Sequence, residues 1–463
     1  MTTIERLYGV YCESHTVTTD SRQITPGCIF FALKGERFDG NAFVEQALAE
    51  GAALCVASDR RFDGHDRVAV VDDVLATLQE LARHHRRHLA IPVIGITGTN
   101  GKTTTKELIN AVLSRRYSTA CTAGNHNNHI GVPLTLLAIG SRAQVAIVEM
   151  GANHPREIEQ LCSIADPDCG LVTNVGRAHL EGFGGFEGVV RTKTELYRHI
   201  AQKSGTLFVN ADNERLMREA EPLATIPPTE SPLPAYMPAT PVLTADALAA
   251  TPLTLLTYGS SPEAVVHGSP ATTAAPDDPY MRFYFEVGDR VYTVHTHLLG
   301  NYNFDNCMAA VAVGLFFGVE PFDIKEAIEG YVPQNQRLEY KVSERGNRLY
   351  LDCYNANPSS MAAAIESFRI MGGTMAIIGG MRELGRESRM EHQKLVDMLE
   401  SCKLDRCLLI GHEFDGLDLP SGMVPLPSTD AAAEWLGSNT PHGATILIKG
   451  SNGNRLWTLE NLL

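Results

Sequence analysis

The stretch from Gly95 to Ile109, GITGTNGKTTTKELI, constrains the fold more than any other part of the sequence. The residues at 91–97, IPVIGIT, form a short apolar run rich in β-branched side chains, which predicts a buried strand. Further along, apolar residues recur at helical spacing: Leu108, Ile109, Val112 and Leu113. We therefore expect a strand, a loop and a helix in direct succession.

The loop between this strand and this helix is suited to bind a phosphate group. A helix start offers unpaired backbone N–H groups and the positive end of the helix dipole. Gly98 and Gly101 allow the backbone to approach closely, Lys102 adds a positive charge, and the Thr103 hydroxyl is a candidate Mg²⁺ ligand. The common pattern G-x-x-x-x-G-K-[ST] is missed by one residue, because Ile96 stands where its first glycine belongs. The alternative is a glycine-rich turn with a solvated lysine.

Length and composition limit the possible classes of protein. A chain of 463 residues predicts two to four domains. A formal charge of −15 argues against general nucleic-acid binding, because it leaves no basic stripe for a phosphate backbone. We see no signal peptide and no apolar run long enough to span a membrane. The ten cysteines are scattered without a C-x-x-C pair, which favours reduced thiols in a cytoplasmic protein.

Strand-like and helix-like patterns alternate along most of the chain, which predicts α/β architecture with mainly parallel sheets. We expect three domains, at residues 1–88, 89–332 and 333–463. One stretch, at about 222–279, is dense in Pro, Ala, Thr and Ser. Such a composition favours extended surface loops over a packed core, so we expect an insertion there.

Polar residues follow two further predicted strands. Glu149 ends the apolar run 145–148, and His179 comes four residues after the strand-like segment 169–175. Because ligands bind at the carboxyl ends of parallel strands, both side chains share an edge with the phosphate loop. Glu149 is therefore a candidate Mg²⁺ ligand. Lys193 lies fourteen residues beyond His179, in VVRTKTELY.

Together the motifs TGTNGKTT, VEMGANHPREIEQL, TNVGRAHLEGFG and RTKTELY resemble those of the Mur ligases, the ATP-dependent amide-forming enzymes of peptidoglycan synthesis. Three stretches, at 19–43, 122–137 and 350–365, resemble the family member that joins D-alanyl-D-alanine to UDP-N-acetylmuramoyl-tripeptide. The resemblance implies an acyl-phosphate intermediate, a central P-loop-type ATPase domain with a parallel sheet, and a Rossmann-like C-terminal domain.

The resemblance also implies roles for particular residues. It implies that ATP is bound by the central loop and by more distant positions: Thr97, Gly98, Thr99, Asn100, Gly101, Lys102, Thr103, Asn303, Asn306, Arg337 and Asp352. It implies that Thr103, Glu149, His179 and Lys193 hold Mg²⁺, and that Lys193, with Lys102 and His179, is catalytic. In the family, the lysine that matches Lys193 is often carbamylated, which converts a cation into an anion able to hold Mg²⁺.

For the substrates, the resemblance implies that Ser21 and Arg22 bind the uridine nucleotide. The remaining substrate-binding positions that it implies are Asn127, Asn128, Asn355 and Asn357. The chain departs from the family pattern at Tyr302, where a histidine is usual, and at Gly380, where an aspartate is common. The C-terminal tail at 448–460 keeps Lys449-Gly450-Ser451 but loses the family's usual continuation. Both this tail and Gly380 lie where the dipeptide and closing contacts are expected.

Two other functions stay open at the level of sequence. One is a sister ligase that adds a single amino acid to a UDP-muramoyl peptide or glutamate to a folate. The other is a nucleotide hydrolase that uses the loop as a switch. We expect a monomer; the third residue of the acceptor peptide, lysine or diaminopimelate, is not encoded in any motif.

Overall fold

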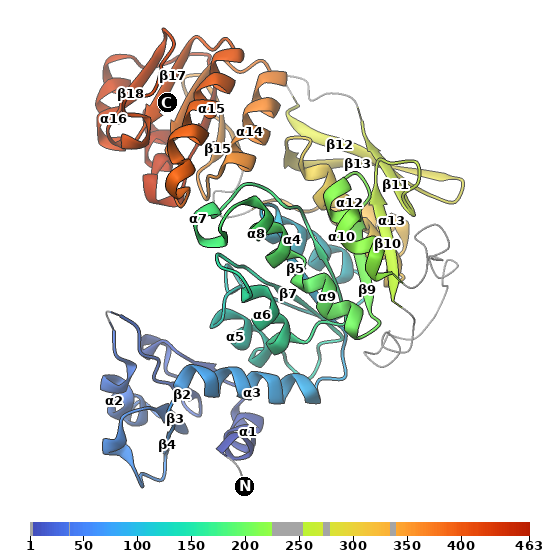
Figure 1. Ribbon diagram of the computed structural model, residues 1–463, viewed down its shortest axis with the longest axis vertical. Coiled ribbons are helices and arrows are strands. Elements are labelled where there is room, and N and C mark those ends of the chain that lie inside the picture. Colours follow the sequence, from blue (N-terminus) through green and yellow to red (C-terminus); the bar gives the residue numbers. More distant parts are fainter. Residues whose placement is uncertain (1–2, 37, 225–252, 272–277, 334–338) are drawn as a thin grey trace.

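A computed structural model of the chain describes residues 3–36, 38–224, 253–271, 278–333 and 339–463. Within these ranges the strands form sheets of four, nine and six strands. The sheets follow one another in chain order along the long axis of the molecule, with the N-terminus at one end (Figure 1). The architecture is α/β with three domains, as the alternating pattern predicted.

The N-terminal sheet is parallel, in the order β1-β2-β3-β4. Its strands are β1 (Val17–Thr18), β2 (Ile29–Phe31), β3 (Leu54–Ala57) and β4 (Val68–Val70). The helices are α1 (Thr3–Ser14), α2 (Val44–Ala49) and α3 (Val74–His88). Helix α3 also contacts helices of the next domain, so it joins the two domains physically (Figure 1).

The central sheet has the order β13-β12-β11-β10-β9-β8-β5-β7-β6, and only the pairs that involve β12 and β13 are antiparallel in the described part of the chain. Its strands are β5 (Val93–Thr97), β6 (Thr119–Cys121), β7 (Val145–Glu149), β8 (Cys169–Val172), β9 (Thr206–Asn210), β10 (Thr254–Gly259), β11 (Val266–Pro270), β12 (Tyr280–Val287) and β13 (Arg290–Leu299).

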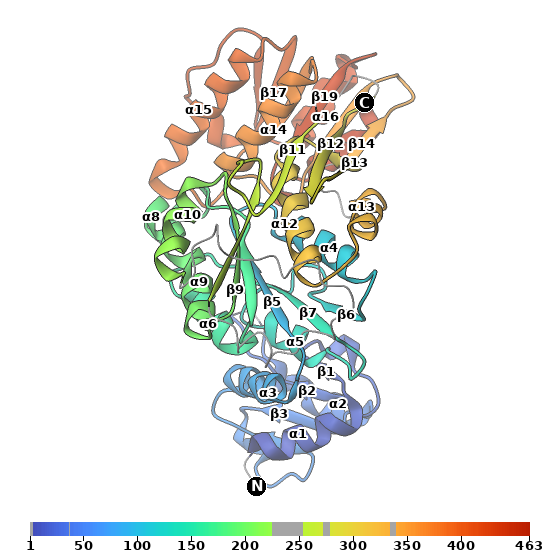
Figure 2. The same cartoon turned by 90° about the vertical axis from the view of Figure 1, so that its right-hand side faces the viewer.

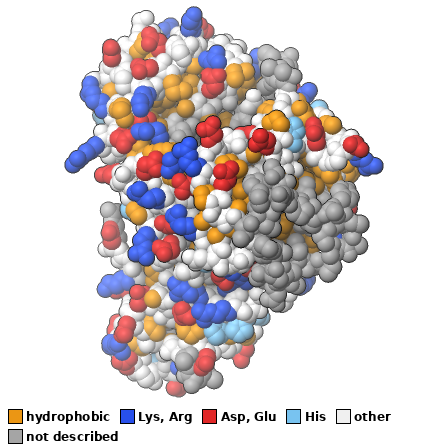
Figure 3. Space-filling model, turned by 45° about the vertical axis from the view of Figure 1, so that its right-hand side comes forward, with side chains coloured by type: hydrophobic (Ala, Val, Ile, Leu, Met, Phe, Trp, Pro, Cys, Tyr) orange, Lys and Arg blue, Asp and Glu red, His pale blue; other side chains and the backbone are white. Residues whose placement is uncertain are grey.

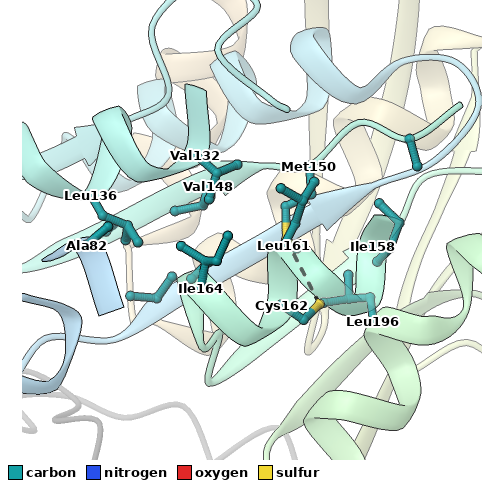
Figure 4. Packing of buried hydrophobic residues seen from close by; sticks show 14 of the residues in the cluster. Ala82, Val132, Leu136, Val148, Met150, Ile158, Leu161, Cys162, Ile164 and Leu196 are labelled. Carbon is teal, nitrogen blue, oxygen red and sulfur yellow. Dashed lines mark hydrogen bonds between the residues drawn. The ribbon is translucent and has the colours of Figure 1, made fainter. Parts of the chain in front are cut away.

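Helices cover both faces of this sheet. They are α4 (Lys102–Leu113), α5 (Gly131–Leu137), α6 (Glu157–Ala165), α7 (Leu180–Phe183), α8 (Phe186–Lys193), α9 (Glu195–Gln202), α10 (Glu214–Ala220), α12 (Asn303–Phe316) and α13 (Pro321–Glu329). Alternate strand residues point to opposite faces: Val93 packs with α5, α6 and α9, whereas Ile94 packs with α4 and α12. Figure 4 shows part of the core on the face to which Val93 points, with side chains of α5 and α6 around Val148 and Met150.

The C-terminal sheet has the order β14-β15-β19-β16-β17-β18, in which β14 alone runs antiparallel among the described strands. The strands are β14 (Glu339–Val342), β15 (Arg348–Asp352), β16 (Met375–Gly379), β17 (Arg406–Ile410), β18 (Met423–Leu426) and β19 (Thr445–Lys449). Helices α14 (Pro358–Ile370) and α15 (Ser388–Ser401) cover one face, and α16 (Thr429–Ser438) covers the other. This is the doubly wound arrangement that the resemblance implied.

The Pro-rich stretch at 222–279 is not made only of surface loops. Strands β10 and β11 lie inside it and extend the central sheet, and Leu255, Leu256 and Tyr258 of β10 are buried. The prediction rested on the average composition of the whole stretch, which is dominated by Pro, Ala, Thr and Ser. It therefore missed the short apolar run LTLLTYG at 253–259. Residues 225–252 and 272–277 lie outside the described residues.

Contacts between the central and C-terminal domains come from the hairpin of β12 and β13 as well as from the loops around the site. Figure 2 shows this hairpin reaching towards the C-terminal sheet. Tyr280 of β12 meets Tyr340 of β14 at a ring-centroid distance of 6.3 Å, and Leu299 is part of the C-terminal core. On the face in Figure 3, acidic and basic side chains are interspersed from one end of the molecule to the other.

Candidate active site

The loop predicted to hold phosphate lies between β5 and α4. Gly98 (φ 146°) and Gly101 (φ 77°) have backbone angles that favour glycine. A Cβ atom at Gly98 would collide with Thr173, and one at Gly101 would collide with the Asn306 amide. The Lys102 ammonium donates to the carbonyls of Gly98 (2.9 Å) and Thr99 (3.0 Å), so the lysine lies folded over its own loop.

Glu149 ends β7 beside this loop and is 1% exposed. Its Oε1 accepts hydrogen bonds from Thr103 Oγ1 (3.2 Å) and Asn127 Nδ2 (2.8 Å). Its Oε2 is buried and has no hydrogen-bond partner among the described residues. Because a buried carboxylate oxygen without a partner is costly, this atom fits a cation ligand.

Lys193 and His179 face the same space. Lys193 is 3% exposed, and its Nζ donates to the carbonyl of Ala152 (3.2 Å) and lies 5.4 Å from the centre of the Phe183 ring. Burial, and secondarily the charge of Lys102, lower the pKa of Lys193 well below its usual value. Burial also lowers the pKa of His179, whose Nδ1 contacts the carboxylate of Glu383.

These groups line one cavity of about 490 Å³ between the central and C-terminal domains. The predicted residues that line it are Gly98, Thr99, Asn100, Gly101, Lys102, Thr103, Asn127, Asn128, Glu149, His179, Lys193 and Asn355. The cavity also has Tyr354 in its wall, beside Asn355, so the C-terminal domain closes part of the site. In the described part of the chain, no three His, Cys, Asp or Glu side chains form a ready metal cage.

Two asparagine side chains fix the starts of helices beside the cavity. Asn128 Oδ1 accepts from the backbone N–H groups of Ile130 (3.1 Å) and Gly131 (2.9 Å), which fixes the start of α5. Asn357 caps α14 in a reciprocal pair with Ser360 and donates to Asn100 Oδ1 (2.8 Å). The last bond connects the phosphate loop directly to the C-terminal domain.

Four predicted nucleotide ligands occupy other places. Thr97, at the end of β5, is buried, and its hydroxyl has no hydrogen-bond partner among the described residues. Asn303 and Asn306 are buried under the loop: Asn306 accepts from Thr105 (2.9 Å) and donates to Asn303 (2.8 Å). Asp352 forms an ion pair with Lys449. A contact of any of these with a nucleotide stays a prediction.

Tyr302, where the family pattern has a histidine, lines a small apolar cavity together with Tyr350 and Phe368 of the C-terminal domain. Arg337 lies outside the described residues. Ser21 and Arg22 form a short helical turn, in which Arg22 is paired with Asp20 (2.8 Å) and its side chain is 87% exposed. Neither Ser21 nor Arg22 lines the cavity between the other two domains in the described structure.

Sequence reasoning missed the polar residues that follow β8. Thr173 Oγ1 donates to the carbonyl of Asn100 (2.6 Å), and Asn174 Oδ1 accepts from the backbone N–H of Asn100 (3.0 Å). These two side chains therefore shape the phosphate loop from the neighbouring strand. Their position directly after a buried strand, at the same sheet edge as Glu149, was the available signal.

A second polar cavity, of about 530 Å³, lies at the carboxyl ends of the C-terminal strands. Its wall includes Arg382, Glu413 and Arg455. A Cβ atom at Gly380 would collide with the Glu413 carboxylate. Glu413 thus places its carboxylate beside the position where the family pattern has an aspartate.

None of the helices in the described ranges combines the length and apolar character that crossing a membrane requires.

Three family models match the chain in succession. They are the Mur ligase family catalytic domain at residues 13–86, the Mur ligase middle domain at 96–226 and the Mur ligase glutamate ligase domain at 336–452. Together they match parts of all three domains.

Curated relatives and solved structures match over nearly the whole length. The UDP-N-acetylmuramoyl-tripeptide–D-alanyl-D-alanine ligase of Bacillus subtilis is 32% identical, over 96% of this chain and 91% of the relative. The ligase of the same name from Escherichia coli is 32% identical, over 90% and 86%. A crystal structure of MurF from Acinetobacter baumannii has a TM-score of 0.81 at 30% identity and covers 96% of this chain and 92% of its own.

A MurF ligase from Thermotoga maritima, solved in complex with ADP, has a TM-score of 0.80 at 26% identity and covers 96% of both chains. The family models, the relatives and the arrangement of the phosphate loop, Glu149 and Lys193 around one cavity all lead to the same assignment. The chain belongs to the Mur ligase family.

Proposed function

We propose that this protein is an ATP-dependent ligase that joins D-alanyl-D-alanine to UDP-N-acetylmuramoyl-tripeptide in peptidoglycan precursor synthesis. The observation that carries the proposal is the cavity where the phosphate loop, Glu149 and Lys193 meet residues of the C-terminal domain. The relatives that bear this activity in their names match the chain over most of their length.

The reaction is an amide condensation, which is uphill in water unless the carboxylate is activated. Transfer of the ATP γ-phosphoryl group to the tripeptide carboxylate forms an acyl phosphate. The amine of D-alanyl-D-alanine attacks this group, and the tetrahedral intermediate expels phosphate. Enzymes of this kind act mainly by positioning and by stabilising charge between anions that repel each other.

The residues of this chain can meet those requirements. The start of α4 and the Lys102 ammonium offer positive charge to the phosphates of ATP. The Asn100–Asn357 bond and the walls of the cavity bring the C-terminal domain over the loop, which limits access of water to an acyl phosphate.

We propose Mg²⁺ as the metal cofactor. The Oε2 of Glu149, which has no partner within the described ranges, and the nearby Thr103 hydroxyl suit a hard cation that prefers oxygen ligands. His179 and a carbamylated Lys193 would complete the protein's side of the site. When bound, Mg²⁺ would neutralise charge on the phosphates during transfer.

The three domains would divide the substrates among them. We propose boundaries at 1–88, 89–332 and 333–463, supported by three sheets whose strands fall within 17–70, 93–299 and 339–449. The first domain would bind the uridine nucleotide through Ser21 and Arg22. We propose that the second cavity receives the dipeptide carboxylate, because Arg382 and Arg455 in its wall are suited to it.

We further propose a monomeric protein that acts in the cytoplasm, where its nucleotide-linked substrate would be made. The alternative function, a sister ligase that adds a single amino acid, would use the same ATP site and would differ in the amine it accepts. A panel of amines therefore separates the two.

The test is phosphate release from ATP with Mg²⁺, UDP-N-acetylmuramoyl-tripeptide and each amine in turn. We expect release that depends on both the nucleotide-peptide and D-alanyl-D-alanine. Release with a single amino acid would assign the sister activity, and release with neither substrate would assign a nucleotide hydrolase. Tripeptides that end in lysine and in diaminopimelate, tested side by side, would identify the preferred acceptor.

A further inference from the structure

The loop that follows β16 crosses to the central domain and meets the loop before α7. Arg177 forms ion pairs with Glu387 and with Glu391 (3.0 Å to the second). Two residues further along the central loop, His179 contacts Glu383 through Nδ1. Glu383 and Glu387, which both come from the loop after β16, therefore bind residues of the central domain that lie two positions apart.

The contact between Glu383 and His179 differs from the arginine pair in its location. His179 lines the cavity that contains Lys102 and Lys193, whereas Arg177 and Glu387 do not line it. A carboxylate can only accept a hydrogen bond, so its partner Nδ1 must carry the proton. In a neutral imidazole with Nδ1 protonated, Nε2 keeps the free electron pair.

Both residues of this contact are held in an unusual backbone conformation. His179 (φ 49°) and Glu383 (φ 61°) lie in the left-handed region, which non-glycine residues rarely adopt. Each is anchored by a buried neighbour: Leu180 in the central core and Leu384 in the C-terminal core. Two independent cores therefore fix the positions from which the two side chains meet.

We propose that Glu383 is a positioning residue that sets the ring orientation and tautomer of His179 when the C-terminal domain is docked. Glu383 thereby leaves the electron pair of Nε2 available to a metal ion in the cavity that His179 lines. Docking of the C-terminal domain and completion of the site become one event. The inference rests on the proposed function, in which His179 helps to hold Mg²⁺.

The competing explanation is that Glu383 only helps to hold the two domains together, as Glu387 does. The two carboxylates make a matched pair for the test, because both come from the same loop and both bridge the same domains. The Glu383 side chain is 60% exposed, so its replacement is not expected to disturb the core.

The experiment measures Mn²⁺ affinity by electron paramagnetic resonance in the full-length protein with ADP, for wild type, Glu383→Ala and Glu387→Ala. We expect Glu383→Ala to weaken Mn²⁺ binding by about tenfold or more, the range seen when a partner of a metal-bound histidine is removed. Glu387→Ala should stay within about twofold of wild type, by the same principle, because it does not touch His179. Equal weakening in both variants, or in neither, would overturn the proposal.

A second variant and a kinetic measurement keep the two roles apart. Glu383→Gln retains an oxygen that accepts from Nδ1, so it should keep most of the Mn²⁺ affinity. In ligation assays, Glu383→Ala should lower kcat while KM for D-alanyl-D-alanine stays close to wild type. If wild type itself does not ligate, the proposed function fails; if wild type ligates and Glu383→Ala matches it in both assays, only this inference fails.

Discussion

Replacement of Arg86 by methionine should destabilise the protein strongly without affecting the chemistry of the site. Arg86 lies in the last turn of α3 and is 5% exposed. Its guanidinium donates to the carbonyls of Ala165 (3.0 Å), Leu89 (3.1 Å) and Asp166 (2.9 Å) and to Asp168 Oδ2 (2.7 Å). The side chain thus connects the helix that joins the first two domains to the segment before β8.

The size of the effect follows from what remains after the substitution. Removal of one partner of a buried ion pair costs about 3–5 kcal/mol. Asp168 would still accept from the backbone of Val93 (2.9 Å) and from Lys203 (3.0 Å), so its charge keeps partners. We therefore expect a loss of unfolding free energy near the lower limit, about 3 kcal/mol. This corresponds to roughly 6–12 °C in Tm if the N-terminal domain unfolds together with the larger, central one.

The assay is differential scanning calorimetry of Arg86→Met beside Arg60→Met. Arg60 pairs with Asp72 at 2.6 Å, but both side chains are largely exposed, so its loss should cost less than about 1 kcal/mol. Ligation by Arg86→Met at 25 °C should remain within about twofold of wild type, because Arg86 acts at the opposite ends of β5 and β8 from the site. Equal Tm values for the two variants would refute the reasoning.

Three further predictions concern the site. Lys102→Ala should lower ligation by about 10²–10³-fold with an unchanged circular dichroism spectrum; full activity would remove Lys102 from the mechanism. Because burial lowers the pKa of Lys193, the uncharged amine that reacts with CO₂ should be easier to form than in a solvent-exposed lysine. Labelled ¹³CO₂ should give a carbamate signal that Lys193→Ala lacks and that fades on acidification, and short carboxylates should partly restore the variant's activity; full activity without them would exclude the role. Arg382→Ala should raise KM for D-alanyl-D-alanine by about tenfold or more, with KM for ATP nearly unchanged; an unchanged KM for the dipeptide would place it elsewhere.

Local sequence patterns predicted the elements that carry the phosphate loop. The run at 91–97 and the helical spacing after the loop correspond to β5 and α4, and the strand expected at 145–148 is β7, with Glu149 at its end. These elements are buried on one or both faces, so their apolar periodicity is strong and short-range. The sequence therefore placed the loop, Glu149 and the start of α4 correctly relative to one another.

Interactions between distant segments could not be predicted in the same way. Glu383 is 204 residues from its partner His179, and no periodicity or spacing connects them. Asn303 and Asn306 match a family motif, yet their amides bond to each other and to Thr105 inside the protein. A motif fixes residue types, whereas the direction of a side chain depends on tertiary packing.

The most direct test of the central claim follows oxygen atoms through the reaction. UDP-N-acetylmuramoyl-tripeptide labelled with ¹⁸O in its terminal carboxylate would be ligated to D-alanyl-D-alanine, and the released phosphate would be analysed by mass spectrometry. An acyl-phosphate mechanism predicts transfer of one ¹⁸O atom from each peptide carboxylate to phosphate. Release of phosphate without ¹⁸O would contradict it, because the γ-phosphoryl group would then have been transferred to water.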